Sequence, residues 1–347
     1  MTQRIYWVPH TVCHFGCLHC HNESVSDGKV TEPALIDRLV EHLPDSDSPY
    51  RLEEVLIGGG EGLALHTNVA HLVQALRERF PAGAEKTLSA RRAAGRLILA
   101  IQTAGLPLAD GAGKLVPDRV RGWVELGVDY FHVASGDMFH RSRQPRYPWD
   151  ALEANMRAYG AETGVEFMIY GKEINRLVPS GRFLENREAL FAQGATLLTD
   201  EGYCAGGWET GSHFLSGTEQ AYPACSEVVI APDGWVHPCC WYLLSPGLFD
   251  LATVTFEAGM QALRSEPYCQ AIDRGDVMAM AERAGAPADW AQRVRAATGD
   301  CGLCRLASRL LTRDPSYAWL QAPSLSERER SFYRSTVADS VLDDLDA

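Results

Sequence analysis

Residues 4–20, RIYWVPHTVCHFGCLHC, join a short extended run to three closely spaced cysteines. The run Arg4–Val8 is rich in the β-branched and aromatic residues that strands favour, and the cysteines follow it in a CxxxCxxC pattern. Residues 54–61, EVLIGGGE, repeat the arrangement, because a second run, Glu54–Ile57, leads directly into three glycines and a glutamate. Each segment therefore predicts a strand that ends in a loop of unusual composition.

Strand and helix signals alternate through the first two hundred residues. Apolar residues at helical spacing follow the extended runs, as in Thr31–Leu43, where Thr31 is placed to cap the helix. The expected strands are residues 4–8, 54–57, 97–102, 130–134, 165–170 and 196–198, and the main helices are residues 31–43, 68–80, 117–126, 149–159 and 181–193. This alternation predicts an α/β fold with a parallel sheet, either open or curled into a barrel. In both cases functional residues belong on loops at the carboxyl ends of the strands.

The composition is that of a packed globular protein with an acidic balance of charge. Of the 347 residues, 46% are hydrophobic and 22% are charged, and the formal net charge is −13. The basic face that binds a nucleic-acid backbone is therefore not expected. No apolar stretch is long enough for a membrane helix, and the N-terminal residues lack the features of a secretory signal. These features predict a cytoplasmic protein with neither nucleic acid nor membrane as a partner.

Ten cysteines are the unusual feature of this composition. Disulfides are rare in a reducing compartment, so metal ligation or chemistry is a better explanation of the even count. Cys13, Cys17 and Cys20 form one group, and soft thiolates in a tight loop suit an iron–sulfur cluster or zinc. Three ligands without a fourth at similar spacing favour a cubane cluster with one open iron, because structural zinc sites are closed by four ligands.

The glycine-rich turn is the second group. Glycines are common where a strand turns towards a helix, but at a carboxyl strand end they also let the backbone approach a ligand closely. Glu61, directly after the glycines, offers an acceptor for an ammonium group.

Together the two loops resemble the radical S-adenosylmethionine (radical SAM) enzymes. In that family, CxxxCxxC after the first strand ligates a [4Fe–4S] cluster, and a GGE motif after the second strand holds the amino group of S-adenosylmethionine (SAM). The resemblance covers about residues 4–205 and implies a partial (β/α)6 barrel of the TIM type. It implies that Cys13, Cys17 and Cys20 hold the cluster, and that SAM contacts Gly58, Gly59, Gly60 and Glu61.

Other residues match the family less closely. His19, before the third cysteine, stands at a position that is often aromatic in the family and touches adenine. Gln102 and Thr103 lie in a segment similar to the family's SAM-adjacent segment after the third strand, with an ordinary β/α turn as the alternative. Ser135 and Asp137 follow the fourth strand, where the family often places polar residues on SAM, and helix capping is the alternative.

A C-terminal set of cysteines is similar to the shortened SPASM, or twitch, extension of this family. Cys225 and Cys239 lie on either side of Gly234, whose turn would fold a hairpin so that both thiols reach one metal. Cys301 and Cys304 follow as a CxxC pair. The similarity implies an auxiliary [4Fe–4S] cluster held by these four cysteines, and structural zinc with the same ligands is the alternative.

Three cysteines remain outside the two groups. Cys240 adjoins Cys239 but would point to the opposite face of a strand, so it is a packing residue or an alternate ligand. Cys269 is interpreted as a buried apolar residue, with alternate ligation as the second possibility. Cys204 follows the sixth expected strand, where its thiol could return a hydrogen atom to a substrate radical or simply fill the core.

These assignments divide the chain into three parts. Residues 1–204 are expected to form the radical SAM partial barrel, residues 205–322 an α+β auxiliary-cluster domain, and residues 323–347 an acidic tail. Loops near the barrel mouth carry candidate substrate contacts at Glu173, Arg182, Trp208 and Glu209.

The resemblance implies an enzyme that reductively cleaves SAM to a 5′-deoxyadenosyl radical and abstracts hydrogen from a carbon atom. The chain starts almost at the first barrel strand, without room for a leader-peptide-binding domain. This favours a small polar substrate, such as a sugar, aminocyclitol or nucleoside intermediate of antibiotic biosynthesis, over a peptide, although a separate protein could supply that domain. A flavodoxin- or ferredoxin-type protein would supply the electron.

Several fates remain open for the substrate radical. Oxidation is expected first, then epimerisation with Cys204 as the hydrogen donor, and then sulfur insertion or dehydration. A peptide-modifying maturase is an alternative, and a non-catalytic iron–sulfur or zinc protein is an alternative of a different class. An ammonium acceptor such as Glu61 has no use in a structural metal site, which argues against the last possibility.

Overall fold

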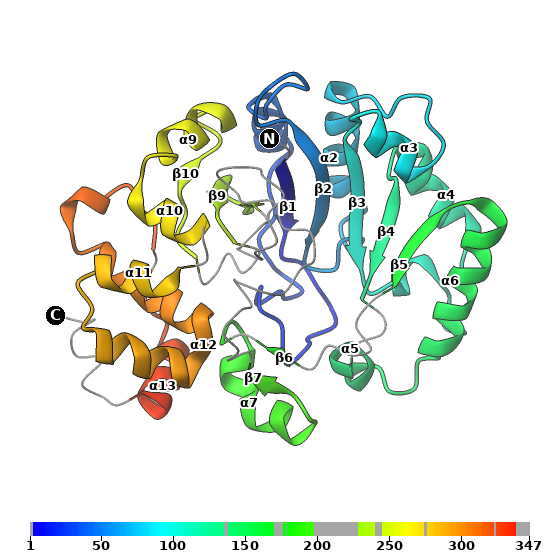
Figure 1. The fold of residues 1–347 in the computed structure, drawn as a ribbon. Helices are drawn as coiled ribbons and strands as arrows, with labels where there is room; N and C mark the ends of the chain where they lie inside the picture. The colour runs from blue at the N-terminus through cyan, green and yellow to red at the C-terminus, as the bar shows by residue number, and fades with distance from the viewer. Residues whose placement is uncertain are drawn as a thin grey trace.

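The computed structural model describes residues 3–134, 138–169, 176–177, 179–197, 228–239, 245–273, 276–322 and 324–337. Among these residues, eight strands form one sheet in the order β10–β9–β8–β1–β2–β3–β4–β5 (Figure 1). The first five are β1 (Gln3–His10), β2 (Leu52–Gly59), β3 (Ile98–Thr103), β4 (Tyr130–Val133) and β5 (Glu166–Ile169). Each is parallel to its neighbour, which confirms the predicted α/β class.

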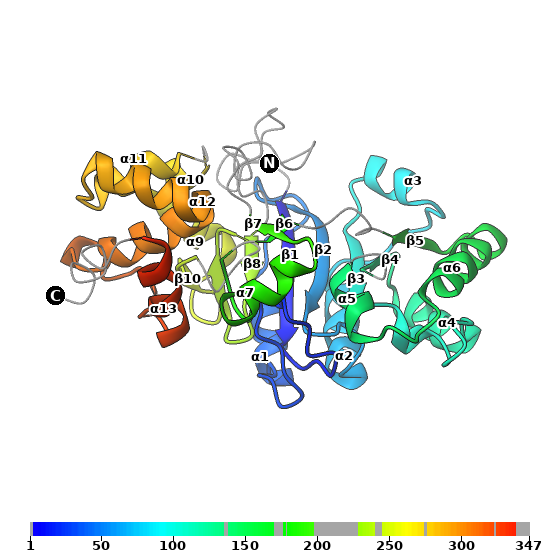
Figure 2. The same cartoon turned by 90° about the horizontal axis from the view of Figure 1, so that it is seen from below.

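Helices connect these strands, and Figure 2 shows α1, α2 and α4 on one side of the sheet. Alternate residues of each strand point to that side, so Ile5, Val55 and Leu99 pack with Leu39 and Leu72 of the helices in the main hydrophobic core. Each buried side chain of this size contributes about 1.5–3 kcal/mol. The helices are α1 (Pro33–Glu41), α2 (His66–Arg79), α3 (Leu88–Ala93), α4 (Pro117–Leu126), α5 (Met138–Arg143), α6 (Trp149–Thr163) and α7 (Phe183–Ala192).

The predicted hairpin around Gly234 is present and continues the same sheet. β8 (Val228–Ile230) pairs parallel with β1, and β9 (Trp235–His237) returns antiparallel to β8. Gly234 has a φ of +88°, a backbone conformation that glycine adopts without a steric cost. β10 (Phe249–Asp250) then forms the edge of the sheet beside β9.

The expected sixth barrel strand does not join this sheet. β7 (Thr196–Leu197) pairs instead with β6 (Arg176–Leu177) in a separate two-stranded sheet. The sixth parallel strand is β8, on the other side of β1. Its Val-Val-Ile run is fully buried, as a strand covered on both faces requires. The mostly parallel sheet remains consistent with the predicted partial barrel.

Thr31 does not cap α1, contrary to the prediction from the sequence. The N-cap residue is Glu32, without a side-chain capping bond, and Pro33 opens the helix. The Thr31 hydroxyl instead donates a hydrogen bond to the carbonyl of Pro232 at 2.9 Å. Thr31 therefore binds the turn of the β8–β9 hairpin and does not cap α1.

Five helices gather beside β10, at the opposite end of the sheet from β5 (Figure 1). They are α9 (Phe256–Leu263), α10 (Pro267–Asp273), α11 (Val277–Arg283), α12 (Ala288–Leu311) and α13 (Glu327–Thr336). Gly299 kinks α12 with a φ of +71°, two residues before Cys301. The buried guanidinium of Arg305 donates to the carboxylate of Glu329 at 2.7 Å, which joins α12 to α13.

Helix α13 occupies residues that the expected acidic tail would include. Ser326 and Glu329 form a reciprocal capping box at its start, and Phe332 and Tyr333 bury their rings. The capping box and the buried rings favour a packed helix here in spite of the acidic residues of the segment. No helix in the described part of the chain combines the length and the apolar character that crossing a membrane requires.

Candidate functional site

The three N-terminal cysteines lie in one loop after β1. The Cys13 amide donates to the Val25 carbonyl at 2.8 Å, and the Cys20 amide donates to the Cys17 carbonyl at 3.2 Å. Gly16, with a φ of +61°, lets the loop turn between the first two thiols. No three potential ligand side chains among the described residues are already arranged around a common metal position.

The electrostatics of this loop suit a bound cation. Burial, with smaller contributions from negative charge on Glu61, Cys17 and Cys20, raises the pKa of the Cys13 thiol to about 12. The three sulfurs are therefore close enough to repel one another when ionised. A metal cluster removes this penalty, because thiolate ligands bind it in their deprotonated form. The donor set and its placement thus fit the predicted [4Fe–4S] cluster.

The glycine-rich turn packs directly against the cysteine loop. The Gly60 amide donates to the His10 carbonyl at 3.1 Å, and the Glu61 amide donates to the Val12 carbonyl at 3.0 Å. A Cβ atom on Gly60 would stand 2.1 Å from the Val12 carbonyl oxygen. The two motifs that sequence analysis placed at one sheet edge are therefore joined backbone to backbone, and Gly60 is required by this close approach.

Gly58 makes room for a polar contact that sequence analysis missed. The Tyr6 hydroxyl donates to Gln102 Oε1 at 2.7 Å and accepts from the Gly59 amide at 2.8 Å. A Cβ atom on Gly58 would lie 2.5 Å from the Tyr6 hydroxyl oxygen. Tyr6 alternates with the core residue Trp7 along β1. That alternation is the sequence signal that could have placed Tyr6 on the other face of the sheet, away from the helix-packed core, which is called the inner face here.

Replacement of Gly58 by alanine should therefore displace the Tyr6 hydroxyl and break its bond to Gln102. We expect a loss of about 1–3 kcal/mol in the free energy of unfolding, as for other overpacked sites. Chemical denaturation measures it. A Gly111→Ala variant is the matched control, because a Cβ atom there meets nothing within 4 Å. Equal stability of the two variants would contradict the steric explanation.

Glu61 is buried and accepts three hydrogen bonds from its own chain. They come from the Thr103 hydroxyl, the Ala104 amide at 2.9 Å and the Leu63 amide at 3.2 Å. Burial raises the pKa of the Glu61 carboxyl, and these donors partly oppose the shift. A carboxylate has about four acceptor positions, so internal bonds use most of the capacity that was predicted to receive an ammonium group.

The two neighbouring residues at the end of β3 point to opposite faces. Thr103 is buried, donates to Glu61 and accepts from the Gly105 amide at 2.9 Å. Gln102 instead meets Tyr6 on the inner face. Thr103 is therefore a supporting residue for Glu61, and Gln102 alone of the pair shares the inner face with Tyr6.

Helix α5 lies against the cysteine loop. The His19 ring stacks on Phe139 with ring centroids 4.5 Å apart and meets His140 edge-on at 5.4 Å. Arg143 Nε donates to the Phe15 carbonyl at 3.3 Å. The planar ring of His19 is thus engaged by an aromatic partner of this chain. The other predicted residues near this helix, Ser135 and Asp137, lie outside the described residues.

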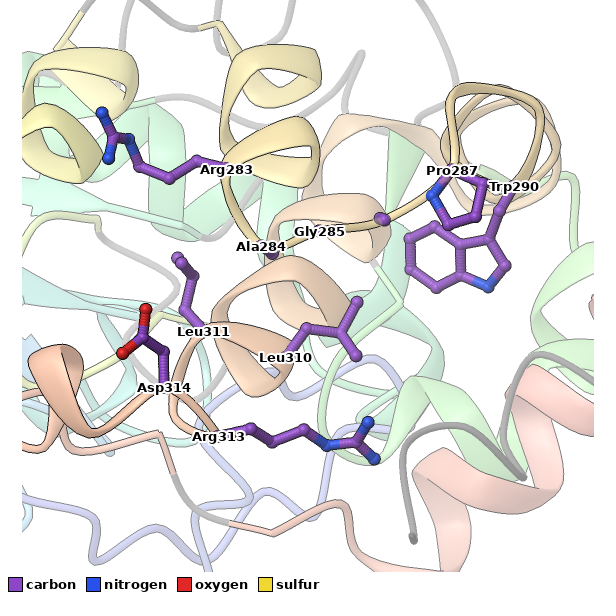
Figure 3. A pocket seen from close by; sticks show the side chains of 10 residues that line it. Arg283, Ala284, Gly285, Pro287, Trp290, Leu310, Leu311, Arg313 and Asp314 are labelled. Carbon is purple, nitrogen blue, oxygen red and sulfur yellow. The ribbon is translucent and has the colours of Figure 1, made fainter.

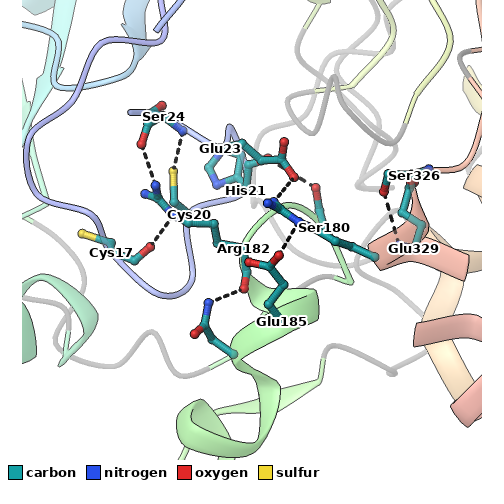
Figure 4. Close-up of polar contacts among 12 residues, drawn as sticks. Cys17, Cys20, His21, Glu23, Ser24, Ser180, Arg182, Glu185, Ser326 and Glu329 are labelled. Atoms are coloured by element: carbon teal, nitrogen blue, oxygen red, sulfur yellow. Dashed lines mark hydrogen bonds and ion pairs between the residues drawn. The ribbon is translucent and has the colours of Figure 1, made fainter. Parts of the chain in front are cut away.

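Arg182 is bound to the cysteine loop, although sequence analysis took it for a substrate contact (Figure 4). Its Nε donates to the Cys17 carbonyl at 3.0 Å and its Nη1 to the Ser24 carbonyl at 2.8 Å. Its backbone amide donates to the Cys20 carbonyl at 3.0 Å. The other candidate substrate contacts, Glu173, Trp208 and Glu209, lie outside the described residues.

The C-terminal cysteines are only partly within the described residues. Cys301 and Cys304 lie on α12 at a spacing that puts them on one helix face, and Cys239 is buried two residues after the end of β9. Burial raises the pKa of Cys304 to about 12, with a further contribution from Cys301. Cys204, Cys225 and Cys240 lie outside the described residues, so the auxiliary cluster stays a prediction. Cys269 is fully buried in the hydrophobic core, as the apolar interpretation predicts.

A surface cavity of about 610 Å³ lies apart from these residues (Figure 3). It is lined by residues 283–287, 290, 310, 311, 313 and 314, from the region of α11 and α12. None of the predicted site residues contributes to it.

Buried histidines make the fold sensitive to acid. Burial lowers the pKa of four imidazoles to about 4, those of His10, His21, His132 and His237. Each folded pKa lies below the unfolded value of about 6.5. The contribution of each neutral histidine to the free energy of unfolding is therefore complete above pH 6.5. It is lost as the pH falls towards 4, by up to about 3 kcal/mol per histidine. In denaturation measured between pH 7.5 and 4.5, His132→Gln should show a shallower decline than the unsubstituted protein. Parallel curves would contradict this.

A comparison with protein families finds one match, and it covers the cysteine loop. A family model described as a 4Fe–4S single cluster domain matches residues 4–90, which include both the CxxxCxxC run and the Gly-Gly-Gly-Glu turn. Over this segment the chain is similar to 4Fe–4S cluster domains. The match confirms the predicted cluster chemistry of this segment, and the packing of the two motifs at one sheet edge agrees with it.

The other comparisons add less about this chain. No curated protein matches it. Among solved structures, native anSMEcpe with bound AdoMet has 11% sequence identity and a TM-score of 0.47, with 100% of both chains covered. Native anSMEcpe with bound AdoMet and the Cp18Cys peptide has 12% identity and a TM-score of 0.46, with 100% of this chain and 99% of that chain covered. At this level of similarity neither substrate nor reaction is established.

Proposed function

We propose that this protein is a radical SAM enzyme that abstracts a hydrogen atom from a carbon of a small polar molecule and oxidises that molecule. The observation that carries the proposal is the direct packing of the Gly-Gly-Gly-Glu turn on the cysteine loop through the Gly60 and Glu61 amides. A structural metal site has no need of a second loop that combines close backbone approach with a buried carboxylate. A SAM-cleaving site needs both beside the cluster.

In this proposal Cys13, Cys17 and Cys20 hold the cluster, and SAM binds beside residues 58–61. When bound and reduced, the cluster would supply the electron that splits SAM into methionine and a 5′-deoxyadenosyl radical. Glu61 would offer its remaining acceptor position to the SAM ammonium group, held in place by its bonds to Thr103 and Ala104. His19 and Gln102 are the proposed contacts of the rest of SAM, together with Ser135 and Asp137.

Oxidation requires the substrate radical to lose one electron and one proton. We assign the acceptor of that electron to an auxiliary cluster held by Cys225, Cys239, Cys301 and Cys304. The product is then a ketone if the substrate is an alcohol, and each product consumes one SAM. A flavodoxin- or ferredoxin-type protein is the proposed donor of the electron that starts each turnover.

Anaerobic reconstitution tests the assignment to this enzyme class. We expect close to eight irons per chain, and release of 5′-deoxyadenosine when SAM and a one-electron reductant are added. Incubation with deuterated sugars, aminocyclitols and nucleosides should place deuterium in the released 5′-deoxyadenosine for the substrate class that binds. Iron-free, zinc-loaded protein that leaves SAM intact would end the proposal.

The fate of the substrate radical is tested separately. Oxidation predicts one SAM consumed per oxidised product, and unchanged turnover after Cys204→Ala. Epimerisation predicts that Cys204→Ala loses product while 5′-deoxyadenosine release continues. Loss of sulfide from the auxiliary cluster in a single turnover would indicate sulfur insertion. Deuterium transfer from a peptide, and from none of the small molecules, would indicate that the substrate is a peptide.

A further inference from the structure

The segment Ser180–Arg182 closes on the cysteine loop from the side of helix α7 (Figure 4). Arg182 is the N-cap residue of α7 and reaches the carbonyl groups of two cysteines, Cys17 and Cys20, as well as that of Ser24. We propose that Arg182 is a positioning residue that fixes the cluster-binding loop and raises the reduction potential of the cluster. This inference rests on the proposed ligation of that cluster by Cys13, Cys17 and Cys20.

The geometry of the segment is specific to this contact. Gly181 has a φ of +57°, and a Cβ atom there would stand 2.4 Å from the Cys20 carbonyl oxygen. The Ser180 hydroxyl adds a bond of 3.4 Å to the His21 carbonyl. The planar guanidinium presents its donors in a fixed fork, so one side chain holds the loop at Cys17 and at Ser24 at the same time. The spacing of the loop between its second and third thiols is therefore set from outside the loop.

The charge of Arg182 is not balanced by a carboxylate in the described part of the chain. Its partners there are neutral carbonyl groups, and its Nη2 is buried without a hydrogen-bond partner among the described residues. The two acidic residues on either side of it, Glu23 and Glu185, both pair with Arg328. A partly buried cation is stabilised by a compensating negative charge. A cluster ligated by three thiolates carries that charge on the loop that Arg182 contacts.

A fixed cation at this position favours the reduced cluster. Reduction adds one electron, supplied by an external one-electron donor, and so adds one negative charge to the cluster. A guanidinium is a fixed positive charge, and that of Arg182 donates to the backbone carbonyl of the proposed ligand Cys17. Attraction to the extra electron is stronger in a half-buried site than in water. Net charge and hydrogen bonding around the ligands are known determinants of cluster potential.

Four full-length variants test the inference after anaerobic reconstitution. Arg182→Met removes charge and bonds, Arg182→Gln keeps one donor without the charge, and Arg182→Lys keeps the charge. Arg187→Met is the matched control, because Arg187 lies on the same helix but contacts Phe332 and Ser335. Redox titration followed by electron paramagnetic resonance gives the potential, and iron release to a chelator gives the stability of the loop.

Arg182→Met and Arg182→Gln should make reduction about tenfold less favourable, which for one electron is 59 mV. Arg182→Lys and Arg187→Met should stay near the unsubstituted potential. Iron release should be roughly tenfold faster in the Met and Gln variants, as for loss of other outer contacts of metal ligands. If Arg182→Met retains no iron, the comparison of reduction potentials between Arg182→Gln and Arg182→Lys tests the inference. Equal potentials for Gln and Lys would overturn the inference and leave the proposed function intact, whereas unsubstituted protein without a cluster would overturn both.

Discussion

Replacement of Cys20 by alanine should abolish the reductive cleavage of SAM. In the proposed site Cys20 supplies the third thiolate, and alanine at this position keeps the backbone bonds to Arg182 and Cys17 but removes the sulfur. We expect 5′-deoxyadenosine release to fall by more than about 100-fold, beyond the 10–100-fold that loss of an outer contact costs. Iron content per chain and 5′-deoxyadenosine, quantified after reconstitution, measure the effect.

Cys269→Ala is the matched control. Cys269 is fully buried in the hydrophobic core, so its loss should cost about 1 kcal/mol of stability and leave iron content and SAM cleavage unchanged. Retained activity in Cys20→Ala would remove Cys20 from the ligand set. Iron loss in Cys269→Ala would move Cys269 into a ligand set.

Replacement of Arg305 by methionine should produce the largest loss of stability in the C-terminal helices. Arg305 is 2% exposed, and its Nε and Nη2 both reach the carboxylate of Glu329. Removing the cation leaves Glu329 as an uncompensated buried charge, which costs about 3–5 kcal/mol. It also removes the link between α12, which bears Cys301 and Cys304, and α13. The free energy of unfolding from chemical denaturation gives the size of the effect.

Arg328→Met provides the comparison for this variant. Arg328 is the neighbour of Glu329 on the same helix, but its ion pair with Glu23 is exposed on both sides, at 45% for each side chain. Exposed pairs contribute up to about 1 kcal/mol. A loss in Arg328→Met as large as that in Arg305→Met would show that burial is not the source of the effect.

The sequence was sufficient for the elements whose signals are local. Helix α4 begins at Pro117 and ends at Leu126, as predicted, because a proline at the first turn and a glycine after the last define both ends. β1 and β2 were predicted from apolar runs that stop at unusual loops. The cysteine loop and the glycine-rich turn then came together because parallel strands end at the same sheet edge.

The contacts that sequence analysis missed depend on residues far apart in the chain. Arg182 follows Cys17 by 165 positions, and no spacing or periodicity connects them. The same applies to Thr31 and Pro232, which are 201 positions apart. Glycines were predicted to admit a ligand, but a sequence cannot say which neighbour takes up the space. At Gly58 and Gly60 that neighbour is the chain itself.

The pairing of β1 with β8 has a consequence for how the protein is made. Ile5 pairs with Val228, so the strand that precedes the cysteine loop receives its second neighbour only after the long intervening segment has been synthesised. At ribosomal rates this takes on the order of ten to forty seconds. During that interval β1 is an unprotected edge, open to pairing with strands of other nascent chains. A chaperone that covers this edge should therefore raise the yield of intact protein.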